Sequence, residues 1–112
     1  MIYVKNIFFN PGSASLDRKS KLALDRVALL IKTNPKLKFE VRGHTDDRGG
    51  EEKNIRLSQS RADNVVKYLA SKGVPTNRLV AKGYGESQPL VKSTSSAARA
   101  LNRRIEFFVI ED

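Results

Sequence analysis

The chain alternates between two hydrophobic periods, and this alternation constrains its fold more than any other feature. Apolar residues recur every three or four positions over residues 16–33 and 51–72, which predicts two amphipathic helices. Over residues 37–42 they recur at every second position, as in a strand with one buried face. Similar short patterns predict further strands at residues 2–9, 78–82 and 105–109.

The predicted elements follow the order β-α-β-α-β-β. Such an order favours a two-layer α/β sandwich: a mixed four-stranded sheet with two main helices on one face. Ser15 is expected to cap the start of the first helix, and Gly73 to end the second with a positive φ. A helical turn is expected between Ala97 and Asn102.

Length and composition indicate one domain over residues 1–112. A chain of 112 residues can bury one modest core, and without cysteine it has no disulfides or thiol chemistry. The net charge of +9 favours an anionic partner such as nucleic acid, a phospholipid surface or an acidic polymer, although a solvated basic surface would also explain it. Met1 is followed by a strand pattern rather than a signal peptide, so any targeting signal is expected on a longer parent chain.

The residues that could support catalysis or hold a metal are too few. His44 is the single histidine, and a zinc or iron site usually needs three protein ligands. No nucleophile elbow or phosphate-binding loop is present, and the adjacent Asp46 and Asp47 point apart in an extended loop. We therefore expect no enzyme, no metal and no cofactor.

A nucleic-acid-binding module is the main alternative from composition. A basic α/β sandwich of this size resembles an RNA-recognition module in outline. The aromatic signature of such modules is missing, however, and one ring of each pair Phe8–Phe9 and Phe107–Phe108 must face the core. We therefore expect no nucleic-acid partner.

The second predicted helix carries the most informative polar pattern. Asn54, Ser58 and Arg61 share one helical stripe, which we expect to lie opposite the apolar stripe. Asp46 precedes this helix, so a carboxylate and a guanidinium could meet in one shallow site and bind the two charges of a free amino-acid end. A surface salt bridge between Arg61 and Asp46 or Asp47 is an equally good interpretation. The first interpretation predicts that Arg61→Ala weakens ligand binding with little effect on folding.

At these positions the chain resembles the peptidoglycan-binding domain at the C-terminus of outer-membrane protein A. That family includes peptidoglycan-associated lipoprotein and the flagellar stator protein MotB. The resemblance covers about residues 7–110. It is carried, in the family's order, by Gly43-His44-Thr45-Asp46, Asn54, Leu57-Ser58, Arg61-Ala62, Gly73-Val74, Arg78, Gly83-Tyr84-Gly85-Glu86, Pro89, Arg99 and Asn102-Arg103-Arg104 to Glu106.

The resemblance implies non-covalent binding of peptidoglycan through the meso-diaminopimelate of its stem peptide. By position, Asp46 would hold the ligand ammonium and Arg61 its carboxylate. Asn54, Arg103 and the backbone near Gly12 would line the same site. Supporting roles would fall to Thr45, Leu57 and Ser58.

The chain departs from the family pattern at a few positions. Ser93, Ser95 and Ala98 replace residues that are often Asn, Thr and Gly, which bears on the loop before Arg99 and on the placement of Arg103. Gly12 stands where some members have Asn. The resemblance implies a periplasmic domain of a longer envelope protein, linked to the outer membrane only through that parent. The oligomeric state is not indicated.

Overall fold

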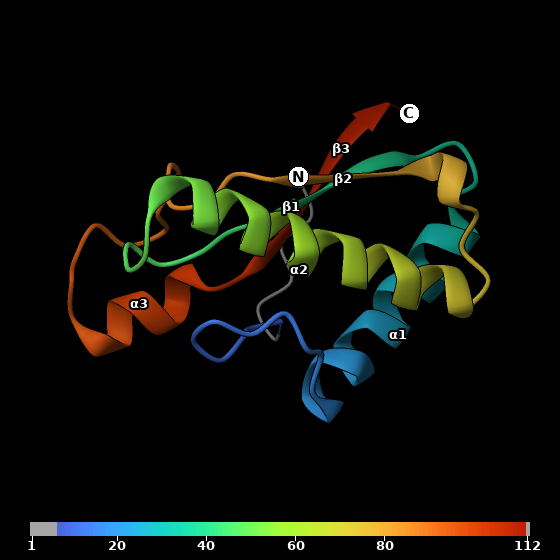
Figure 1. Ribbon diagram of the computed structural model, residues 1–112. Helices are drawn as coiled ribbons and strands as arrows, with labels where there is room; N and C mark the ends of the chain where they lie inside the picture. The colour runs from blue at the N-terminus through green and yellow to red at the C-terminus, as the bar shows by residue number, and fades with distance from the viewer. Residues whose placement is uncertain (1–6, 112) are drawn as a thin grey trace.

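The computed structural model describes residues 7–111, which form helices packed on a mixed sheet (Figure 1). The elements in chain order are α1 (Arg18–Thr33), β1 (Lys38–Gly43), α2 (Glu51–Ser71), the 3₁₀ turn η1 (Thr76–Arg78), β2 (Leu79–Gly83), α3 (Ser96–Asn102) and β3 (Ile105–Glu111). The sheet has the strand order β2-β1-β3. Strand β1 pairs in parallel with β2 and antiparallel with β3.

The expected four-stranded sheet has three strands within the described residues. The predicted first strand, residues 2–9, lies mostly outside the described part of the chain. Of residues 7–9, only Phe8 pairs with the sheet, through an isolated antiparallel bridge to Arg104. The mixed sheet and the alternation of helices and strands from α1 onward agree with the prediction.

One hydrophobic core joins α1, α2 and the inner face of the sheet. Leu24 and Ile31 from α1 and Val65 from α2 meet Phe39 and Phe107 from the strands, and all of them are buried. Both long helices therefore pack on the same face of the sheet. Among the described residues, no helix is long and apolar enough to cross a bilayer.

The helix ends follow local capping chemistry. Asp17, and not Ser15 as expected, caps α1: its carboxylate accepts the backbone N–H of Ser20 at 2.7 Å. An aspartate directly before the first helical residue reaches that N–H, which Ser15 is too far upstream to do. Helix α2 ends as predicted, with Gly73 at φ +94°.

The amino-terminal half of α2 lies directly over the ends of β1 and β2. A side chain at Gly43 would overlap the backbone carbonyl of Ser58, and one at Gly83 would overlap the backbone of Gln59. Only glycine permits this close approach. This close packing places the loop after β1 beside the start of α2.

The late loop and the predicted helical turn place the start of β3. Ser95 caps α3, since its Oγ accepts the N–H of Ala98 at 3.1 Å. Asn102 at the end of α3 holds the loop: its Oδ1 accepts the N–H groups of Leu90 and Val91 at 2.7 and 3.0 Å. Two of the positions that depart from the family pattern, Ser95 and Ala98, thus form a regular helix start just before Arg103.

Candidate functional site

A pocket of about 280 Å³ lies at the amino-terminal end of α2. Its walls come from the turn after Phe9, the loop after β1, the first three turns of α2 and the residue that follows α3. Seven of the eight residues expected at the site line it: Gly12, Thr45, Asp46, Asn54, Leu57, Arg61 and Arg103. The eighth, Ser58, does not line it.

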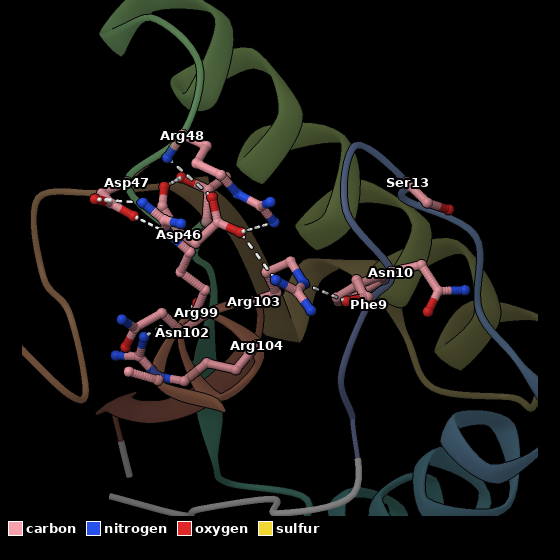
Figure 2. A network of polar contacts seen from close by, with 12 residues as sticks. Phe9, Asn10, Ser13, Asp46, Asp47, Arg48, Arg99, Asn102, Arg103 and Arg104 are labelled. Carbon is pink, nitrogen blue, oxygen red and sulfur yellow. Dashed lines mark hydrogen bonds and ion pairs between the residues drawn. The ribbon is translucent and has the colours of Figure 1, made fainter. Parts of the chain in front are cut away.

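Asp46 supplies the single carboxylate of the pocket lining, and both of its oxygens accept hydrogen bonds (Figure 2). Its Oδ1 accepts the backbone N–H of Arg48 at 3.0 Å, and its Oδ2 accepts from the guanidinium groups of Arg103 at 2.9 Å and Arg48 at 3.2 Å. Burial raises the pKa of Asp46, but these hydrogen bonds outweigh burial and hold the pKa below its ordinary value. The carboxylate is therefore ionised at neutral pH.

Arg61 forms the floor of the pocket and is completely buried, with 0% of its surface exposed. Its guanidinium donates to three backbone carbonyls: from Nε to Ser13 at 2.8 Å, from Nη1 to His44 at 2.9 Å and from Nη2 to Asn10 at 3.1 Å. Burial and the nearby charge of Arg103 lower the pKa of Arg61 to about 10, partly offset by Asp46, so it stays protonated at neutral pH.

The expected surface salt bridge of Arg61 is therefore wrong. It does not form, because Asp46 pairs with Arg48 and Arg103, while Asp47 pairs with Arg99 at 2.7 Å. The burial of Arg61 also changes the prediction for Arg61→Ala: we now expect a loss of stability, because three buried carbonyls would lose their donor. The reason is that the turn before α1 folds over Arg61 and removes it from solvent.

Arg103 joins the two ends of the described chain at the pocket. Its Nε donates to the carbonyl of Phe9 at 2.8 Å, and its own carbonyl accepts the N–H of Phe9 at 3.1 Å. Figure 2 shows its guanidinium between Asp46 and Phe9. The neighbouring Arg104 does not line the pocket and pairs with Glu106 at 3.1 Å.

The polar stripe of α2 lies on the same side of the helix as its apolar residues. The expectation that it would lie on the opposite side is wrong. Asn54, Ser58 and Arg61 are buried on the side that also carries Val65 and Leu69, because all five follow the same three- and four-residue spacing. Asn54 donates from Nδ2 to the carbonyl of Asp46 at 3.4 Å. Ser58 accepts the N–H of Gly85 at 2.9 Å and fixes the turn after β2.

His44 and Thr45 shape the loop that carries Asp46. His44 Nε2 lies 2.8 Å from a carboxylate oxygen of Glu106, and the backbone N–H of Thr45 donates to the Gly85 carbonyl at 2.9 Å. Burial lowers the pKa of His44, so its ring is neutral at neutral pH. These contacts fix the loop backbone, including the His44 carbonyl that accepts a hydrogen bond from Arg61.

Four lining residues were missed from the sequence: Pro11, Arg48, Gly49 and Lys53. Arg48 follows Asp46 by two positions, a spacing that favours contact within a short loop and could have been noticed. With Arg48, Lys53, Arg61 and Arg103 against Asp46, the lining carries four positive side chains and one negative side chain. Such a pocket favours a ligand with a carboxylate or another anionic group.

Metal ligands do not gather in the described part of the chain. Residues 7–111 contain no group of three His, Cys, Asp or Glu side chains that could hold a metal ion. The pocket instead combines one ionised carboxylate, several guanidinium groups and backbone carbonyls, which is an arrangement for binding a small charged group.

The fold and the pocket define a small α/β domain whose candidate site combines a loop aspartate with one buried arginine and one partly exposed arginine. A sequence profile described as "OmpA family" matches residues 8–103, and the chain belongs to that family. It is 38% identical over 101 residues to "Probable lipoprotein YiaD" of Escherichia coli (strain K12), covering 90% of this chain and 46% of that protein. The chain spans between 22% and 65% of the length of three curated relatives that it matches.

Solved structures agree with this assignment. The peptidoglycan-associated lipoprotein from Burkholderia pseudomallei matches with a TM-score of 0.88 and 29% identity, over 92% of this chain and 87% of that chain. The C-terminal domain of Helicobacter pylori MotB matches with a TM-score of 0.88 and 32% identity, over 96% of this chain and 84% of that chain. The family expected from the sequence motifs is therefore confirmed.

Proposed function

We propose that the chain binds peptidoglycan through the meso-diaminopimelate of its stem peptide. The observation that carries this proposal is the meeting of Asp46, Arg61 and Arg103 in one pocket at the start of α2. A relative of the same fold is named a peptidoglycan-associated lipoprotein, which supports the choice of polymer. The free amino-acid end of diaminopimelate carries an ammonium and a carboxylate, and the pocket offers a partner for each.

In this proposal Asp46 receives the ligand ammonium. The side chain of Arg48, which is 50% exposed, already occupies one side of Asp46 Oδ2 at 3.2 Å. An incoming ammonium replaces this half-exposed guanidinium and keeps the carboxylate paired with a positive charge. Arg103, whose side chain is 12% exposed, stays in place because the Phe9 carbonyl also holds it.

The ligand carboxylate is assigned to the guanidinium of Arg61. Arg61 has five N–H hydrogens, and the three described acceptors leave one on each of Nη1 and Nη2. Because the turn at Pro11 and Gly12 covers Arg61, the proposal requires this exposed turn to shift before the carboxylate can reach it. Asn54 and Leu57 complete the wall next to it.

The domain is proposed to anchor a longer periplasmic protein to the cell wall and to carry out no catalysis. Ionised Asp46 is held by cations and is unsuited to donate a proton. Its parent would connect it to the outer membrane. A nucleic-acid role is not favoured by the relatives. Three of the described phenylalanine rings are also unavailable for stacking on bases: Phe9 and Phe107 are buried, and the Arg42 guanidinium covers Phe108 at 3.6 Å from the ring centre.

The test is co-sedimentation with purified sacculi that carry either diaminopimelate or lysine in their stem peptides. We expect binding to the first type only, because lysine lacks the second amino-acid centre. Asp46→Asn should weaken binding by about tenfold or more, since one charged partner of the ligand is lost. Asp47→Asn is the matched control: this neighbour is exposed, pairs with Arg99 and lies outside the pocket. Equal binding to both sacculi would contradict the diaminopimelate assignment.

Free ligands provide a second measurement. Meso-diaminopimelate should raise the melting temperature, because a ligand that binds only the folded state stabilises it. Free L-lysine at the same concentration should have much less effect. Arg61→Lys, which keeps the charge but not the planar fork, should retain part of the shift if it folds.

A further inference from the structure

The outward face of α1 carries an exposed apolar patch, which we call the leucine patch and define as Leu22, Leu29 and Leu30. These side chains are 54%, 62% and 41% exposed. Leu22 and Leu29 are seven residues apart and so lie on one line along the helix. They lie opposite the side of α1 that packs into the core through Leu24 and Ile31.

Basic residues surround the leucine patch. Arg18, Lys19, Lys21 and Arg26 are all exposed on α1. Within residues 7–111, no ion pair engages Arg18, Lys21 or Arg26. The sequence of α1 contains five Lys or Arg residues and one Asp.

The single acid of α1 is neutralised by the neighbouring helix. Asp25 accepts the hydroxyl of Tyr68 at 2.6 Å and lies 3.8 Å from the ammonium of Lys72. It therefore does not balance the positive charge around the leucine patch. The exposed side of α1 combines three leucines with four cations, of which Arg18, Lys21 and Arg26 have no ion pair among the described residues.

Helix α2 shows that this combination is particular to α1. Its exposed large apolar residue is Ile55, at 44%. Its exposed charges are balanced, with the acids Glu51, Glu52 and Asp63 against the bases Lys53, Arg56 and Lys67. Arg56 also pairs with Glu52 at 3.0 Å. A long helix of this fold thus does not need a basic apolar outer face in order to pack.

We propose that the outward face of α1 docks on an anionic phospholipid surface. Leucines that insert between acyl chains, together with Lys and Arg that reach lipid phosphates, are the two features that interfacial helices combine. A second copy of this chain fits less well, because it would bring two strongly positive helices together. A nucleic acid would use the cations and leave the leucines exposed.

Docking through α1 is independent of the pocket at the start of α2. No residue of α1 lines that pocket. The proposal therefore goes beyond wall binding and adds direct contact with a membrane to the indirect one expected through the parent protein. A domain with both surfaces can hold the wall and a bilayer at once.

The test is co-flotation of the 112-residue chain with vesicles of phosphatidylethanolamine and phosphatidylglycerol, compared with phosphatidylcholine vesicles. We expect association with the anionic vesicles and little with the zwitterionic ones, weakening as salt increases. The double variants Leu22→Ser with Leu29→Ser, and Arg18→Gln with Arg26→Gln, should each reduce the partition coefficient by about tenfold or more.

The matched control is Ile55→Ser with Lys67→Gln on α2, which should change partitioning by less than about twofold, since neither residue belongs to the α1 face. All altered residues are exposed, so melting temperatures and binding to sacculi should stay near wild type. Equal binding to both vesicle types, or no effect of the leucine variant, would overturn the proposal. It would also be overturned if light scattering found a dimer that the leucine variant dissociates, because the patch would then be a contact between copies.

Discussion

Arg61 and Arg103 lie in the same pocket but are held in different ways. Arg61 is fully buried and donates to three backbone carbonyls, without a carboxylate partner. Arg103 remains partly exposed and divides its donors between a carboxylate, Asp46, and a carbonyl, that of Phe9. Arg61 therefore holds the backbone around the pocket in place, and Arg103 pairs with the carboxylate of Asp46.

The largest expected effect comes from Arg61→Ala. This change leaves the carbonyls of Asn10, Ser13 and His44 without their donor and opens a cavity beneath the pocket. It should lower the free energy of unfolding by about 3 kcal/mol or more. Chemical denaturation measures the loss. A nearly unchanged denaturation midpoint would show that the three carbonyls find other donors. Arg61 would then not be the residue that holds the backbone of the pocket.

A smaller loss of stability is expected for Arg103→Ala. It removes one ion pair and one carbonyl hydrogen bond at a partly exposed position, so we expect a loss of about 1 to 2 kcal/mol. The same change should raise the pKa of Asp46, which loses a hydrogen-bond donor. Carboxyl chemical shifts followed by NMR during a pH titration report this directly. A greater destabilisation than for Arg61→Ala would reverse the roles of the two arginines.

Acid titration tests the ion pairing of Asp46, in which Arg103 takes part and Arg61 does not. The pKa of Asp46 is lower in the folded chain than its usual unfolded value of about 3.9. Its contribution to stability is therefore present above that unfolded value and is lost as the pH falls through the lower folded value. Other carboxylates share this behaviour, so the measurement is the difference between wild type and Asp46→Asn, which should shrink below about pH 4. A constant difference would contradict the lowered pKa.

The smallest expected effect is that of Arg48→Ala. Arg48 is half exposed, and its ion pair with Asp46 should contribute less than about 1 kcal/mol to folding. If the ligand ammonium must displace this side chain, the variant should bind diaminopimelate a few-fold more tightly. Calorimetry with the free ligand tests this, and weaker binding would show that Arg48 holds the ligand itself.

The sequence predicted most elements because their patterns are local. Helices α1 and α2, with Gly73 at the end of α2, follow from spacing and from one conformational requirement. Burial of Arg61 could not be predicted in this way. It depends on the turn at residues 10–13 folding over α2. A helical spacing of three or four residues shows that polar side chains share one face of a helix, but not whether that face is exposed or buried. The position of Asn54 and Ser58 on the core side was missed for the same reason.

The contact between Phe9 and Arg103 has a consequence for the order of folding. These two residues are 94 positions apart, and the hydrogen bonds between them close nearly the whole described chain into one ring. Contacts with such separation carry the largest loop-closure entropy and form only after helices and neighbouring strands reduce that cost. We expect mutations at Arg103 to accelerate unfolding and leave the folding rate almost unchanged, which stopped-flow kinetics would record. The pocket is then the last part of the molecule to assemble, and a partly folded chain lacks it.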